Sequence, residues 1–285
     1  MRRTFGPVAA LGLGLAIATG CAAGAASPSL PPDADGFALR AWITQALPPQ
    51  DAFRTPGVAF AIHDGLLITP GAVPAIYPGP LLTPLFAQRI SEMGEAAILD
   101  AARQAGLLDG PTDLTGGPQP GAPTGHLLLV IDGVEREVVG NPNSMIVCIT
   151  TPCDAAPGSP EAFGGYWSLV SNAAGWLGPE VGEPETYEPE RLGVLLTEPV
   201  LDATMPIQRS EWPLDDPMAE LGVELDGPAG TPPVRCGVLE GDALPGALAA
   251  FGAANQLTRW VDGTGAEFGA VTRPLFPGEP DPCTG

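Results

Sequence analysis

Glycine and proline constrain this chain more than any other residue types. There are 38 glycines and 35 prolines among 285 residues, about a quarter of the chain. Neither residue is favoured inside helices or strands, so this content predicts short elements joined by long, stiff loops. Because 45% of the residues are hydrophobic and several segments are periodic, the chain still has enough apolar surface for a folded core.

The first 21 residues resemble a bacterial lipoprotein signal. Arg2 and Arg3 precede an uncharged stretch over residues 8–18, and small residues then lead into Cys21. This stretch is too short to cross a bilayer of about 30 Å as a helix. We therefore expect residues 1–20 to be removed and Cys21 to be lipidated, which anchors the protein on the outer face of the cell membrane. The alternative is an ordinary secretory signal in which Cys21 is incidental.

The charge of the chain excludes several classes of function. The formal net charge is −21, and all 12 basic residues are arginines. A chain this acidic repels nucleic acid and anionic lipid headgroups, which require clustered basic residues. The absence of lysine excludes Schiff-base, P-loop and general-base lysines. The acidity instead favours solubility outside the cell, or the attraction of cationic partners and divalent ions.

Four cysteines follow Cys21, and an even number in an exported chain predicts two disulfides with three possible connectivities. Cys148 and Cys153 enclose a short loop with a proline, so we expect these two to pair. Cys236 would then bond to Cys283 and tie the final segment back to a sheet. An oxidising compartment disfavours zinc binding by these thiols, and we predict no metal or other cofactor.

The periodic segments predict an α+β fold with two related halves, each a small antiparallel sheet with one packed helix and long Pro/Gly-rich loops. The predicted regions are a signal peptide (1–20), a flexible tether (21–36), an N-terminal half (37–178), an acidic Pro-rich linker (179–190) and a C-terminal half (191–285). The tether consists mainly of small residues and prolines and lacks the regular spacing of apolar residues that a helix or strand shows, so we expect it to separate the folded part from the membrane.

The N-terminal half opens with a predicted amphipathic helix over residues 39–47, which ends at two prolines. Two β-hairpins are predicted around Asp64-Gly65 and Asp132-Gly133, because Asp-Gly between apolar runs favours a tight turn. Between them we expect a strand over 86–90 and a helix that begins after Ser91 and ends at Gly106. His63 and His126 lie beside the hairpins, and we expect solvated or core-edge positions for both.

The C-terminal half repeats this order in the sequence. A strand over 234–239 precedes a helix with Asp242 as its predicted cap, and a third Asp-Gly pair at 262–263 joins two further strands. A duplication would make residues 84–139 and 233–275 superpose with the same strand order.

Several segments resemble a family of uncharacterised lipoproteins from high-GC Gram-positive bacteria. They are Ala75-Ile-Tyr-Pro-Gly-Pro80, Ala101-Ala-Arg-Gln-Ala-Gly-Leu107, Cys148-Ile-Thr-Thr-Pro-Cys153 and Asn255-Gln-Leu-Thr-Arg-Trp260 with Arg273-Pro-Leu275. The resemblance covers most of residues 55–283. It implies an exported, membrane-anchored protein of unknown function and supplies no catalytic residues.

No catalytic motif stands out from the sequence. Serine-hydrolase and zinc-protease motifs are absent, and no pair of carboxylates is marked by spacing. We predict no catalytic residues. The best ligand-binding candidates are the aromatic residues Phe163, Tyr166, Trp167 and Trp176, which could stack on a glycan or clasp a peptide; their near-helical spacing also fits core packing.

The sequence therefore predicts a non-enzymatic, membrane-anchored binding or accessory module of the cell envelope. Its partner would be an envelope protein, a peptide or a glycan. The alternative is an envelope hydrolase that uses two carboxylates. A deep cleft that holds two carboxylates, one of them in an apolar wall, would favour the hydrolase.

Overall fold

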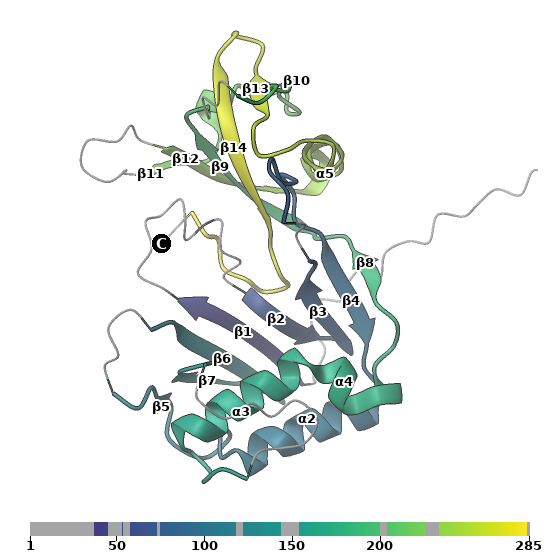
Figure 1. Ribbon diagram of the computed structural model, residues 1–285, viewed down its shortest axis with the longest axis vertical. Helices are drawn as coiled ribbons and strands as arrows, with labels where there is room; N and C mark the ends of the chain where they lie inside the picture. Colours follow the sequence, from purple (N-terminus) through teal and green to yellow (C-terminus); the bar gives the residue numbers. More distant parts are fainter. Residues whose placement is uncertain are drawn as a thin grey trace, which may run out of the picture.

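The structure is a computed structural model that describes residues 37–44, 53, 58–72, 75–117, 122–143, 154–199, 204–225 and 234–283. Within these residues the protein has a mixed α+β fold with two halves, each built on its own β-sheet (Figure 1). The predicted fold class is confirmed. The segment that follows the last strand runs between the two sheets, and its Phe276 packs into a core cluster of the N-terminal half.

Eight strands form the N-terminal sheet, in the order β5-β7-β6-β1-β2-β3-β4-β8. Neighbouring strands are antiparallel except β5 and β7, which are parallel. Their bounds are β1 (Ala38–Thr44), β2 (Val58–His63), β3 (Leu66–Pro70), β4 (Leu85–Arg89), β5 (Asp113–Leu114), β6 (Thr124–Ile131), β7 (Val134–Gly140) and β8 (Glu185–Tyr187).

Residues 39–44 lie in the central strand β1, so the prediction of an amphipathic helix is wrong for them; residues 45–47 of the predicted helix lie outside the described residues. β1 pairs with β2 along one edge and with β6 along the other. Leu39 and Ala41 are buried in the main core, whereas Trp42 packs against a cluster on the opposite face. In so short a run, the apolar positions fit both a helical and a strand pattern, and pairing along both edges favours the strand.

Both predicted hairpins of the N-terminal half are present. Asp64 and Gly65 connect β2 to β3, and Asp132 and Gly133 connect β6 to β7. All four residues have positive φ, between 49° and 75°. This backbone is typical of the two-residue turns that match the twist of paired strands, and Asp-Gly tolerates it well.

Helices cover one face of the eight-stranded sheet (Figure 1). They are α2 (Glu92–Gln104), α3 (Pro160–Ser171) and α4 (Ala173–Leu177), so this half carries more than the one helix predicted. As predicted, Ser91 caps α2, and its hydroxyl accepts a hydrogen bond from the Gly94 N–H at 3.1 Å. Ser159 caps α3 in the same way, through the Ala162 N–H at 3.1 Å. In both helices the serine hydroxyl accepts from the backbone N–H three residues later. This satisfies one of the N–H groups that have no hydrogen-bond partner within the helix at its start.

Six strands form the C-terminal sheet, in the order β10-β13-β14-β9-β12-β11. Their bounds are β9 (Arg191–Thr197), β10 (Arg209–Glu211), β11 (Val223–Leu225), β12 (Val234–Glu240), β13 (Arg259–Val261) and β14 (Glu267–Pro274). One helix, α5 (Leu244–Gly252), packs on this sheet. The predicted cap at Asp242 is wrong, because residues Gly241–Ala243 form a 3₁₀ turn and no side chain caps α5.

The strand order of the two halves differs, so the predicted superposition of residues 84–139 and 233–275 is wrong. In the N-terminal sheet, β6 is the inner strand of its hairpin and β7 the outer one. In the C-terminal sheet the second hairpin strand, β14, is the inner one and pairs with β9. The acidic segment 179–190, expected as a linker, contains β8 and so adds a strand to the N-terminal sheet.

Candidate functional site

The aromatic residues predicted as a binding surface pack the core of the N-terminal half. Phe163, Tyr166 and Trp167 on α3 are 0%, 2% and 7% exposed, and Trp176 is half-buried against the same cluster. The Phe60 and Trp167 rings meet edge to face, with 5.4 Å between their centroids. This is the core packing that the sequence left open.

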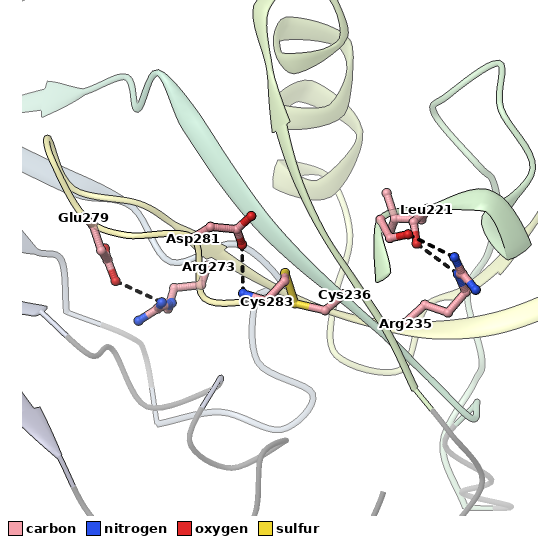
Figure 2. Close-up of a disulfide and its surroundings, with 8 residues drawn as sticks. Leu221, Arg235, Cys236, Arg273, Glu279, Asp281 and Cys283 are labelled. Carbon is pink, nitrogen blue, oxygen red and sulfur yellow. Dashed lines mark hydrogen bonds and ion pairs between the residues drawn. A yellow bond between two sulfur atoms is a disulfide. The ribbon is translucent and has the colours of Figure 1, made fainter. Parts of the chain in front are cut away.

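The disulfide predicted between Cys236 and Cys283 is confirmed. It joins β12 to the C-terminal segment (Figure 2). Near it, Arg273 of β14 forms a 2.9 Å ion pair with Glu279; the Glu279 side chain is buried and that of Arg273 is partly buried. Cys21, Cys148 and Cys153 lie outside the described residues, so the lipidation site and the second disulfide remain predictions.

A cleft of about 750 Å³ lies on the N-terminal half, bordered by the C-terminal segment, and we call it the open-face groove. Its size is that of a typical small-ligand site. Its lining comprises Phe37, Ala38, Leu39, Arg40, Ala61, Ile62, His63, Asp64, Gly65, Ile90, Glu92, Glu95, Leu128, Val130, Gly133, Glu135, Pro277 and Gly278.

Strand alternation brings several of the groove residues to the face away from the helices. On β6, Leu127 and Leu129 are fully buried in the main core, whereas Leu128 and Val130 are half-buried and line the groove. Arg40 of β1 is directly opposite Leu128 in the register. Because side chains on opposite residues of paired strands project to the same side, Arg40 shares the face of Leu128, away from the helices.

Arg40 connects the groove to the C-terminal segment. Its guanidinium donates a hydrogen bond to the carbonyl of Gly278 and lies 5.2 Å from the centre of the Trp42 ring. Burial lowers the pKa of Arg40, while the carboxylates of Glu279, Glu135 and Glu137 act in the opposite direction. Arg40 is therefore a half-buried cation that is already surrounded by acidic groups.

Next to the groove, Trp42 stacks on His126 with 4.9 Å between ring centroids. His126 Nδ1 lies 2.8 Å from Glu137 Oε1, and its Nε2 lies 2.9 Å from Thr44 Oγ1. One face of the Trp42 ring is thus covered by His126, and Arg40 approaches the ring as well. This stacking links β1 to β6 on the face of the sheet away from the helices.

An acidic corner closes the groove beside the β2–β3 turn. It contains Asp64, Glu92 and Glu95, which the turn and the first turn of α2 bring together. Burial raises the pKa of Glu95, the Gly65 N–H opposes this shift, and the charges of Glu92 and Asp64 raise the pKa further. The Oδ2 atom of Asp64 is buried and accepts no hydrogen bond from the described residues.

The groove is lined by both charged and apolar side chains. In the part of the chain that the structure describes, no group of three or more His, Cys, Asp or Glu side chains is placed to hold a metal ion. No helix among the described residues is long and apolar enough to cross a membrane.

Comparison with protein-family models, curated proteins and solved structures finds no match to this chain.

Sequence reasoning did not find the groove. Its polar side chains come from β1, the first hairpin, the start of α2 and β7, and residues 277–278 complete the lining, so its parts are far apart along the chain. Two usable signals are present in the sequence. Glu92 and Glu95 lie in the first turn of the helix predicted after Ser91, and Arg40 lies in the segment predicted as an amphipathic helix.

Proposed function

We propose that this protein is a lipid-anchored binding module of the cell envelope, held on the outer face of the membrane through Cys21. The observation that carries the binding role is the open-face groove, a cleft of about 750 Å³ lined largely by strands of the eight-stranded sheet. Sites built on strands position their side chains more precisely than sites built on loops. The signal pattern before Cys21 supports the location.

Site-specific crosslinking on intact cells tests the binding role. A photoreactive residue at Leu128 lies in the groove, and a matched probe at Val223 lies on the edge strand β11 of the other half. A partner captured from Leu128 and not from Val223 supports the groove as the binding site. Equal capture from both positions, or capture from Val223 alone, would contradict it.

Fractionation of cells that express Cys21→Ala tests the anchor. We expect the variant to leave the membrane fraction for the soluble fraction, because a cysteine is needed to carry the lipid. A Cys21→Ala protein that stays with the membrane would refute lipid anchoring at this residue. The wild-type protein is the control.

A second function, a carboxylate-dependent hydrolase, is favoured by one observation. Glu95 lies in the groove with its pKa raised by burial and by the neighbouring charges of Glu92 and Asp64. A carboxyl with a raised pKa can act as a general acid toward a glycosidic oxygen. Incubation of the protein with isolated cell-wall glycan should then release new reducing ends, and Glu95→Gln should abolish the release. No release by the wild-type protein would exclude this activity on that glycan.

A further inference from the structure

We propose that the open-face groove binds an extended basic peptide whose Lys or Arg side chains flank an apolar one, because its apolar floor lies between two acidic ends. This inference rests on the proposed binding function and names the ligand class for the same site. It goes beyond the general acidity of the chain, since it assigns a spacing to the charges of the ligand.

The floor of the groove is apolar and partly exposed. Leu128 and Val130 of β6 are half-buried although their neighbours Leu127 and Leu129 are fully buried. Ala38 of β1 lies directly opposite Val130 and also belongs to the lining, whereas Arg40 separates Leu128 from Ala61 of β2. An apolar side chain of a ligand that covered this floor would remove hydrocarbon surface from water on both molecules.

Carboxylates occupy the two ends of the groove. At one end are Asp64, Glu92 and Glu95 beside the β2–β3 turn, and at the other is the exposed Glu135 of β7. Asp64 Oδ2 has no hydrogen-bond partner among the described residues, and its nearest basic group is His63 Nε2 at 3.8 Å. Among the described residues, no arginine forms a salt bridge with Asp64, Glu92, Glu95 or Glu135.

The positive charge of the groove is already used within the protein. Arg40 donates to the Gly278 carbonyl, and its guanidinium lies in the field of Glu279, Glu135 and Glu137. An acidic ligand would meet four carboxylates in the lining and one engaged arginine. Charge complementarity consequently favours a cationic ligand over an anionic one.

The register of the sheet sets the spacing of the ligand charges. β2, β1, β6 and β7 are consecutive neighbours, so the acidic ends lie about three inter-strand spacings apart, roughly 14 Å. Ala38 lies opposite Val130, and Val130 lies opposite Glu135, so one row of residues crosses the groove from β1 to β7. An extended peptide covers about 3.3 Å per residue. Two positive side chains of the ligand that match the acidic ends are therefore four residues apart in its sequence. The residue midway between them points to the same side and would reach the apolar floor.

Binding of short peptides to the full-length protein in detergent tests this inference. The probe is acetyl-Lys-Ser-Leu-Ser-Lys-amide, whose two lysines and leucine project to one side of an extended chain. The isomer acetyl-Lys-Lys-Leu-Ser-Ser-amide has the same charge and composition but the wrong spacing. A third peptide, acetyl-Glu-Ser-Leu-Ser-Glu-amide, reverses the charge. We expect the first peptide to bind most tightly at about 0.15 M salt, where long-range attraction is screened within about 8 Å.

Three variants locate the binding. Asp64→Asn and Glu135→Gln each remove one charge from an end of the groove, and Asn is well suited to the positive φ of residue 64. We expect each to weaken the first peptide by about two- to five-fold, the range for partly exposed ion pairs. Glu220→Gln removes the same charge from an exposed site in the other half and should leave the affinity unchanged.

Other outcomes overturn the inference. These are equal affinity for the two basic isomers, tighter binding of the acidic peptide, no binding of any peptide, or equal weakening by Glu220→Gln. Crosslinking from Leu128 distinguishes failure of the basic-peptide inference from failure of the proposed binding function. If Leu128 captures a partner while the basic peptide does not bind, the groove remains a binding site and the ligand class is wrong. If Leu128 also captures nothing, both proposals fail.

Discussion

Removal of the Cys236–Cys283 disulfide should destabilise the protein strongly. The two cysteines are 47 residues apart, and the loop-entropy relation for a crosslink of this length gives about 4 kcal/mol at 25 °C. Both residues are buried, at 0% and 5% exposure, in a small core cluster. At roughly 2–4 °C per kcal/mol for a chain of this size, the expected fall in Tm is about 10 °C.

Urea denaturation of Cys236→Ala, Cys283→Ala and the double variant measures this effect. Each single variant already loses the crosslink, so the three should lose similar free energies of unfolding. Their effects should therefore be strongly non-additive. A thiol count on the unfolded wild-type protein provides the control, because both cysteines should be unreactive until reductant is added.

Two results would refute this reasoning. A loss below about 1 kcal/mol in the double variant would show that the crosslink does not restrict the unfolded chain as the loop model requires. Additive losses in the single variants would show that side-chain packing of each cysteine, rather than the bond between them, carries the stability.

Three further substitutions have defined outcomes. The wild type should lose free energy of unfolding relative to Glu95→Gln as the pH rises above 4.5, because burial raises the pKa of Glu95 and its ionisation therefore opposes folding. Denaturation of both proteins at a series of pH values measures this difference, and a difference that does not change with pH contradicts it. Gly140→Ala should lose about 1–3 kcal/mol, since its Cβ would lie 2.5 Å from the Phe163 ring; an unchanged Tm would show that the ring can move aside. Tyr166→Phe should be neutral or slightly stabilising, because the buried hydroxyl has no hydrogen-bond partner among the described residues; a loss above about 1 kcal/mol in chemical denaturation would reveal a partner.

The local parts of the fold were predictable from the sequence. Asp64-Gly65 and Asp132-Gly133 form the expected turns, and Ser91 begins the expected helix. In each case the signal lies within a few residues, because the backbone conformation of a tight turn or a helix start is set by its own side chains.

The errors share a physical cause. Residues 39–44 were assigned to a helix although pairing with β2 and β6, distant in sequence, makes them a strand. Asp242 has the chemistry of a helix cap but lies in a 3₁₀ turn before α5. Tertiary contacts decide such segments, and a short apolar pattern does not contain that information.

The candidate site could not be predicted from the sequence for the same reason. Arg40, Glu95, Glu135 and Gly278 become neighbours of one groove only through the register of the sheet and the path of the C-terminal segment. The aromatic residues around α3 were the more conspicuous signal in the sequence. Their burial shows that aromatic content alone does not distinguish a binding surface from a core.

The path of the C-terminal segment determines when the groove can exist during synthesis. Pro277 and Gly278 form part of its lining, Phe276 is buried among residues of the N-terminal half, and Cys283 ties the segment to β12. The rest of the lining is complete in the chain by Glu135. A nascent chain must therefore be extended by more than 140 further residues before its groove is closed. For the same reason, cutting the chain between the two sheets would not yield an N-terminal fragment with a whole binding site.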